Sequence, residues 1–449
     1  MQSLRIGITG PIADKNLGDY AMFINNLLEL GPSHRYVAFT YDKEFLGILK
    51  ECYLQELTMD GCDVRMAESN APRRARWRRP LRRCRSLAQR CLGVPRHPMR
   101  TFETPLELLR SVENYDEIRS AIESLDVLVV SGGGYLNRPW YGRYGQERLF
   151  RILVPVLLAD ALSKKIVFTG NTYGPFDDAI EFFRMNLAPL KDAVFGHRDD
   201  LLSPANLRAL GIAPWKMRSV PDDLSVLRPE LKNSQAPLPD GPYIILESCY
   251  PLSYVEKHVQ EVKAFVEGLY AQHGVKTLFV PFTSGGEGEI QGRLLERHID
   301  ASCFQTWSLE GGFLRIDDAY KLISGATMLV TNRYHGVVLA VSAHTPVVNM
   351  LKDAIDYRYY YTKIRGFLDK VFEGIGWDDR FLIRTSMLDA FSFVSEDFDR
   401  IREVQGAWTS AERHRENVEV LTEKRLALIH GVVAAEHKPI ERSPAAQPR

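Results

Sequence analysis

Short apolar runs that end at glycine or charged residues alternate with helical segments along this chain, and this pattern constrains the fold more than any other feature. The apolar runs lie at 4–9, 36–40, 126–130, 165–169 and 192–196 in the first half, and at 243–246, 277–282, 328–331 and 346–350 in the second. Buried strands separated by helices are typical of βαβ units and of a parallel sheet. The sequence therefore predicts an α/β fold.

Two domains are expected, because 449 residues are too many for one hydrophobic core. A stretch rich in proline, 228–242, divides the alternating pattern into two parts. We expect an N-terminal domain at 1–230, a linker at 231–242, a C-terminal domain at 243–390, a helical segment at 391–435 and a flexible tail at 436–449. Both domains are predicted to be doubly wound and Rossmann-like, and to face each other across a cleft. In such sheets, ligands bind outside the carboxyl ends of the strands.

An insertion at 71–100 contains eleven arginines and no acidic residue, although the whole chain has 57 basic and 57 acidic side chains. The overall balance argues against a surface built for nucleic acid, so no nucleic-acid partner is expected. The insertion is either a solvated segment or a peripheral contact with anionic lipid headgroups, to which each arginine contributes about 1 kcal/mol.

The sequence shows no targeting signal, so we expect a cytoplasmic protein. The inner face of the membrane is an alternative location. The N-terminus is typical of a strand and not of a signal peptide. The longest apolar candidate for a membrane span, 149–162, is interrupted by Arg151, Pro155 and Asp160. The six cysteines form no C-x-x-C pair, so neither a zinc site nor a redox pair is expected.

Glycines follow two strands of the first half. Asn16, Gly18 and Asp19 come after the first strand, where a helix N-terminus favours anions; alternatively, Asp19 only caps that helix. Gly132, Gly133 and Gly134 come after the strand at 126–130. Their backbone N–H groups form an anion-binding nest, or else the glycines make a tight turn. The sequence contains no P-loop and no complete dinucleotide fingerprint.

Charged side chains follow other predicted strands. Arg333 and His335 follow the strand at 328–331 and open an apolar helix. An arginine at this position can bind a phosphate or carboxylate. The helix dipole favours a neutral imidazole, which makes His335 a candidate base. Alternatively, His335 only forms a hydrogen bond at the start of the helix. Arg198 ends the strand at 192–196, where it binds a ligand or forms a surface ion pair. Asp222 lies just before the linker. It is a candidate substrate-binding residue, or else it is part of a turn.

These motifs, in this order and spacing, resemble the polysaccharide pyruvyl transferase family over most of residues 4–370. The resemblance rests on Asn16-x-Gly18-Asp19, Gly132-Gly133-Gly134, Gly170-x-x-x-Gly174-Pro175, Arg198-Asp199 with Ser203 and Leu210-Gly211, Pro221-Asp222, and Arg333-x-His335-Gly336 with Ala340 and Pro346. Two features depart from the family pattern, namely Tyr334, where the family typically has leucine, and the insertion at 71–100.

The resemblance implies a two-domain fold like that of the GT-B glycosyltransferases. It also implies phosphoenolpyruvate as the donor and a hexose of a polysaccharide or lipid-linked glycan as the acceptor. The product would be a cyclic pyruvate ketal with inorganic phosphate, and no metal or organic cofactor would be needed.

The residues suit that chemistry. Because phosphoenolpyruvate carries a phosphate beside a carboxylate, it requires at least two cationic contacts, for which Arg198 and Arg333 are the candidates, one from each domain. His335 is the candidate general acid or base. Two other functions stay open, namely a nucleotide-sugar glycosyltransferase of the GT-B type and a non-catalytic protein that binds anionic surfaces through 71–100.

Overall fold

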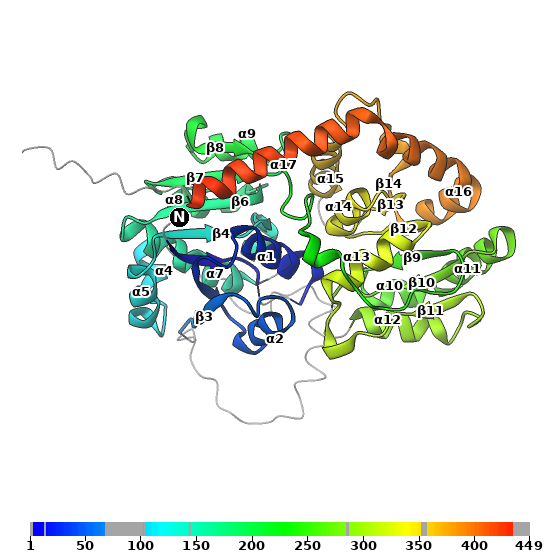
Figure 1. Ribbon diagram of the computed structural model, residues 1–449, viewed down its shortest axis with the longest axis horizontal. Coiled ribbons are helices and arrows are strands. Elements are labelled where there is room, and N and C mark those ends of the chain that lie inside the picture. The colour runs from blue at the N-terminus through cyan, green and yellow to red at the C-terminus, as the bar shows by residue number, and fades with distance from the viewer. Residues whose placement is uncertain are drawn as a thin grey trace, which may run out of the picture.

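The computed structural model describes residues 3–12, 15–67, 102, 104–142, 145–283, 287–351 and 357–433. The arginine-rich insertion at 71–100 and the predicted tail at 436–449 lie outside the described residues. Figure 1 shows two α/β lobes side by side, the first built from the N-terminal half of the chain and the second from the C-terminal half.

The first lobe contains a parallel sheet with the strand order β3-β2-β1-β4-β6-β7-β8, and β5 pairs with β6. Its strands are β1 Arg5–Thr9, β2 Arg35–Thr40, β3 Thr58–Asp63, β4 Val127–Val130, β5 Gly133–Leu136, β6 Lys165–Tyr173, β7 Ala193–His197 and β8 Met217–Ser219. The direction of winding reverses between β1 and β4, which creates a switch point at the carboxyl ends of these two strands.

The second lobe repeats this plan with the strand order β11-β10-β9-β12-β13-β14, again with parallel pairing. Its strands are β9 Tyr243–Glu247, β10 Lys276–Phe279, β11 Phe304–Thr306, β12 Met328–Thr331, β13 Val347–Met350 and β14 Ile383–Arg384. Its switch point lies between β9 and β12. The predicted α/β fold with two doubly wound parallel sheets is therefore confirmed.

Helices connect the strands and cover both sheets. They are α1 Leu17–Leu30, α2 Lys43–Tyr53, α4 Pro105–Arg110, α5 Tyr115–Glu123, α6 Arg138–Gly142, α7 Gln146–Ala161, α8 Ile180–Leu187, α9 Ser203–Ala209, α10 Leu252–Lys257, α11 Val259–His273, α12 Glu287–Glu296, α13 Ile316–Gly325, α14 Tyr334–Ser342, α15 Tyr357–Val371, α16 Met387–Ser410 and α17 Glu412–Val433. The helices α10 and α11 are separate and meet at His258, because the backbone there leaves the helical conformation.

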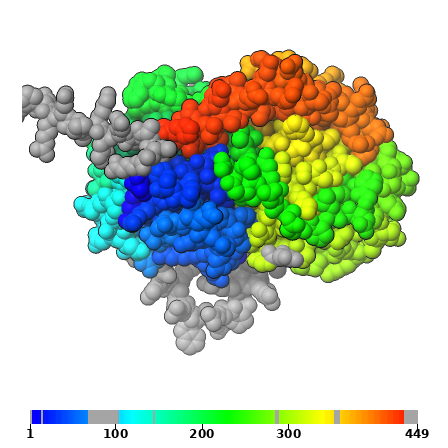
Figure 2. Space-filling view, in the orientation of Figure 1, coloured from blue at the N-terminus to red at the C-terminus, as the bar shows by residue number. Residues whose placement is uncertain are grey.

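The last helix, α17, joins the two lobes. Figures 1 and 2 show that it starts over the second lobe and ends over the first. Near its end, Nζ of Lys165 in β6 donates to the backbone carbonyl of Gly431 at 2.5 Å. Between these points Arg425 is fully buried, and its guanidinium binds Glu29 of α1 at 2.5 Å and Asp223 at 2.6 Å. The C-terminal segment is therefore packed against the first lobe and is not only a solvated charged helix.

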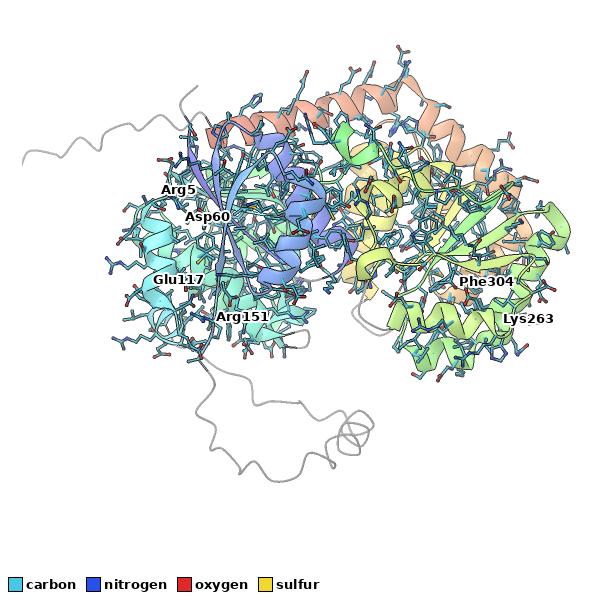
Figure 3. The ribbon with its side chains drawn as sticks, turned by 60° about the horizontal axis from the view of Figure 1, so that its bottom comes forward. Arg5, Asp60, Glu117, Arg151, Lys263 and Phe304 are labelled. Atoms are coloured by element: carbon cyan, nitrogen blue, oxygen red, sulfur yellow. The ribbon has the colours of Figure 1, made fainter. Side chains whose placement is uncertain are left out.

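The outer strands of the two sheets lie far from the junction of the lobes. In Figure 3, Asp60 of β3 and Phe304 of β11 lie on opposite sides of the molecule. The carboxyl ends of the central strands β1, β4, β9 and β12 are therefore left to form the walls between the lobes.

Candidate functional site

A cavity of about 620 Å³ lies between the two lobes at their switch points. Its walls come from the segments that follow β1, β10 and β12, from β5 to α7, and from α15. The lining residues include Asn16, Gly18, Asp19, Gly134, Arg333 and His335, all of which the sequence analysis selected. The structure therefore brings six of the ten predicted site residues to one cavity.

His335 reaches this cavity from the second lobe by packing onto Gly18 of the first. A Cβ atom built on Gly18 would lie 1.8 Å from Nδ1 of His335 and 2.4 Å from Cγ. Such contacts are impossible, so only glycine allows the imidazole to lie where it does. The sequence analysis expected Gly18 to admit a ligand, whereas its closest neighbour is this side chain.

Arg198 and Asp222 support His335 from behind. Nη1 of Arg198 donates to Oδ2 of Asp222 at 2.5 Å and lies 3.2 Å from Nε2 of His335, while Nε of Arg198 donates to Thr172 Oγ1 at 2.9 Å. Both Arg198 and Asp222 are buried completely. The two lobes are thus coupled at the site through one guanidinium.

These surroundings keep His335 neutral. Burial lowers the pKa of His335 to about 4; the Asp222 carboxylate opposes this shift, and the charges of Arg198 and Lys363 add to it. The sequence analysis predicted a neutral imidazole, and the lowered pKa of His335 agrees with that prediction. The largest cause of the lowered pKa is burial, however, and not the helix dipole.

The role predicted for Asp222, direct contact with substrate, is not supported. Its side chain is 0% exposed, Oδ1 accepts from the backbone N–H of Leu224 at 2.9 Å, and Oδ2 is bound by Arg198. Burial alone would raise the pKa of Asp222, but the charge of Arg198 holds it well below its usual range. Asp222 therefore orients the residues that face the cavity.

One nitrogen of Arg198 points toward the cavity wall. Its Nη2 is buried without a hydrogen-bond partner, and it lies 3.2 Å from the position that a Cβ on Gly134 would occupy. The Tyr359 hydroxyl lies 2.6 Å and Lys363 Nζ 3.0 Å from the same position. Two cationic groups, Arg198 and Lys363, therefore converge at Gly134, and the Tyr359 hydroxyl beside them donates to the Gly134 carbonyl at 3.3 Å.

The predicted glycine nest needs a correction. The backbone N–H of Gly132 donates to Asp223 Oδ2 at 2.9 Å, so it is not available to an anion. Gly133 starts β5 and pairs with Asn171 of β6. Gly134 alone of the three lines the cavity, and its contribution is the absence of a side chain.

Arg333 lines the cavity from the second lobe and is held by neighbouring polar groups. Its Nε donates to Glu247 Oε1 at 3.3 Å, and its Nη2 donates to the hydroxyl of Thr283. Glu247 is itself buried and accepts from Thr331 at 2.7 Å. This pairing fixes the direction in which the guanidinium extends into the cavity.

Asn16 and Asp19 open α1 at the cavity wall. The N-cap is Asn16 and not Asp19, since the helix begins at Leu17. Asn16 Nδ2 donates to Asp19 Oδ2 at 2.8 Å, and the backbone of Leu17 donates to Phe282 of the second lobe at 2.9 Å. The first turn of α1 is therefore a direct contact between the lobes.

The sequence analysis missed Lys363 and Tyr359. Both are buried on α15, and Nζ of Lys363 lies 4.2 Å from the ring centre of Tyr334, while Arg198 lies 4.4 Å from it. Tyr334, the departure from the family pattern, thus lies between the two cations that face Gly134. The helix α15 follows the predicted strand at 346–350, but neither Lys363 nor Tyr359 belongs to a motif that the sequence analysis singled out.

Neither a metal cluster nor a membrane-spanning helix is present in the part of the chain that the structure describes. No three histidine, cysteine, aspartate or glutamate side chains there gather in a way that could hold a metal ion. No helix there is both long enough and apolar enough to cross a bilayer.

Solved structures with two facing Rossmann-like domains are similar to this chain in fold. A putative UDP-N-acetylglucosamine 2-epimerase from Listeria monocytogenes has a TM-score of 0.55 at 11% identity, covering 98% of this chain and 99% of that one. The UDP-GlcNAc 2-epimerase from Neisseria meningitidis, bound to UDP-GlcNAc, gives 0.53 at 10% identity over 94% and 99%. HepE from Anabaena, in complex with UDP and glucose, gives 0.50 at 10% over 96% and 98%. The expected GT-B-like architecture is confirmed.

No curated protein matches the chain. The family model for polysaccharide pyruvyl transferases matches residues 36–351, a range that includes Arg198, Arg333 and His335. The chain belongs to the polysaccharide pyruvyl transferase family.

Proposed function

We propose that the protein transfers the pyruvyl group of phosphoenolpyruvate to two hydroxyls of a hexose in a polysaccharide or lipid-linked glycan and releases phosphate. Family membership supports the reaction class. The observation that carries the donor assignment is the convergence of Arg198 and Lys363 at Gly134. Hydrogen bonds from cationic groups to phosphate or carboxylate oxygens are about twice as strong as neutral ones.

The donor needs separate contacts for its two anionic groups. We assign one of them to Arg198 and Lys363 above Gly134, and the other to Arg333, which enters the same cavity from the second lobe. The carboxylate of Glu247 keeps Arg333 in place, so little side-chain entropy is lost when a ligand binds.

In the reaction, C3 of the donor gains a proton, and C2 becomes electrophilic. One hydroxyl oxygen forms a bond to C2; the C–O bond to phosphate then breaks, and the second hydroxyl oxygen closes the ketal. The phosphate leaves with the electron pair and takes up one hydroxyl proton. The other hydroxyl proton replaces the one that C3 takes up, so that atoms and charges balance. A positioned acid or base such as His335 contributes about 10²–10⁴-fold, and the fixed donors near Gly134 stabilise the departing phosphate. We propose that no metal or organic cofactor takes part.

Trp140 and Tyr360 line the same cavity, and we propose that the acceptor hexose packs against them. Aromatic faces suit the apolar C–H surface of a sugar ring. The cavity volume of about 620 Å³ lies within the range of roughly 300–1,000 Å³ usual for small-molecule sites.

The test is release of phosphate from phosphoenolpyruvate in the presence of a panel of lipid-linked or simple β-hexosides. We expect release that depends on both substrates, and we expect His335→Ala to abolish it. His298→Ala, which changes an exposed histidine at the end of α12, serves as the matched control. Release of a nucleotide from nucleotide sugars, with no response to phosphoenolpyruvate, would instead support the glycosyltransferase alternative.

A further inference from the structure

The contact between Arg198 and His335 determines which ring nitrogen carries the proton. Nη1 of Arg198 lies 3.2 Å from Nε2 of His335. A guanidinium has five N–H donors and no acceptor, and it stays protonated in proteins. The hydrogen bond can therefore run in one direction only, from Arg198 to a lone pair on Nε2.

Among the described residues, Asp222 is the carboxylate within 4 Å of Nε2, and it competes poorly with Arg198. Oδ2 of Asp222 lies 3.7 Å away, which is too far for a hydrogen bond, and it is already bound by Arg198 at 2.5 Å. Tyr334 meets the imidazole edge to face, with ring centres 5.1 Å apart. Lys363, from α15, adds a positive charge that disfavours a second proton on the ring.

With Nε2 as the acceptor, a neutral ring carries its proton on Nδ1. Nδ1 is the ring atom closest to the position of a Cβ on Gly18, and both residues line the cavity. Asp19, the next residue of α1, also lines the cavity, and its carboxylate accepts from Asn16. The N–H of the imidazole is thus on the edge that lies against the first lobe, at the wall of the cavity.

We propose that Arg198, which binds the donor through Nη2, also positions His335 through Nη1: it fixes His335 as the neutral Nδ1–H tautomer, so that His335 donates a hydrogen bond to an anionic oxygen of the donor substrate and does not act as a base. The part of this inference that concerns the substrate rests on the proposed function, whereas the tautomer does not. The two hydroxyl protons of the acceptor then need other destinations. The departing phosphate takes one of them, and the other replaces the proton that C3 takes up.

The tautomer is tested without substrate, by nitrogen NMR of the full chain labelled at histidine. Comparison with His335→Asn identifies the signals of His335 among the eleven histidines. We expect a protonated Nδ1 and an unprotonated Nε2 at pH 7, and loss of this preference in Arg198→Met. A wild-type spectrum with the proton on Nε2 would overturn the proposal, even if Arg198→Met fails to fold.

The donor role is tested by phosphate release with His335→Asn and His335→Ala. The amide nitrogen of asparagine takes approximately the place of Nδ1 and can donate, but it cannot act as a base. We expect His335→Asn to keep at least about ten times the turnover of His335→Ala, with an unchanged pH profile. Equal loss in two folded variants contradicts the donor role. If the wild type releases no phosphate from phosphoenolpyruvate, the proposed function fails, while the NMR result still decides the tautomer.

Discussion

Replacing Gly18 with alanine tests whether the position of His335 controls catalysis. The new Cβ would lie 1.8 Å from Nδ1 of His335, and ordinary contact begins at 3.4 Å, so the imidazole has to move by about 1.6 Å or more. It cannot do so and keep its 3.2 Å contact with Arg198. A displacement of this size removes a positioned hydrogen-bond donor and should lower turnover about 10²–10³-fold, which corresponds to about 2.7–4 kcal/mol in activation free energy.

The stability of the same variant should change much less. Overpacking at Gly18 costs roughly 1–3 kcal/mol, but alanine favours the helix over glycine by at most about 1 kcal/mol. The net loss in the free energy of unfolding is therefore expected to be about 0–2 kcal/mol, measured by urea denaturation. Turnover is measured as phosphate release with an acceptor that the wild type accepts.

Gly47→Ala is the matched control. Gly47 lies in α2 of the same lobe, and a Cβ there would meet nothing within 4 Å. This variant should gain up to about 1 kcal/mol of stability and keep wild-type turnover. If Gly18→Ala also keeps wild-type turnover, His335 does not act from the position described, and the reasoning about the site is wrong.

Four further predictions follow from the structure. Lys363→Met removes one cationic donor above Gly134 and should raise the donor KM about 10–100-fold, as expected for a hydrogen bond to a charged group, with kcat less affected. Arg425→Met leaves the carboxylate of Asp223 buried beside its remaining partners and should lower the free energy of unfolding by about 3–5 kcal/mol, measured by urea denaturation. Because burial lowers the pKa of His335 to about 4 from its ordinary 6.5, the unfolded chain binds this proton first as the pH falls. The wild type should therefore lose up to roughly 3 kcal/mol more stability than His335→Asn between pH 7 and pH 4, and an equal loss in both proteins would contradict that pKa. Replacing the arginines of 71–100 with glutamine should reduce co-sedimentation with anionic vesicles at low salt, and unchanged co-sedimentation would exclude membrane docking by this segment.

Most of the sheet could be predicted from the sequence, because central strands are continuous apolar runs. The strands β3, β5, β8, β11 and β14 were not predicted. They lie at or near sheet edges, and their residues are partly polar or glycine, as in Thr58–Asp63 and Met217–Ser219. Edge strands are covered less completely than central ones, so their composition differs less from that of a loop.

The candidate site was predicted where it depends on strand ends and was missed where it depends on packing between distant segments. Arg333 and His335 directly follow a buried strand, so the topology alone places them at the switch point. Lys363 lies within a helix whose sequence does not distinguish a lysine at a cavity from one in solvent. Arg425 was not selected from the sequence, because its carboxylate partners come from α1 and from the segment after β8, far from it along the chain.

The helix α17 restricts how the two lobes can separate. Asp223, which Arg425 binds, also accepts from Gly132, Gly170 and Asn26, so the anchor of the helix is part of the interior of the first lobe. Asp222, the neighbour of Asp223, lies behind His335, so the anchor is on the side of His335 away from the cavity. A separation of the lobes that preserves these bonds keeps them together on the side of α17 and can widen the gap only at the opposite face (Figure 1).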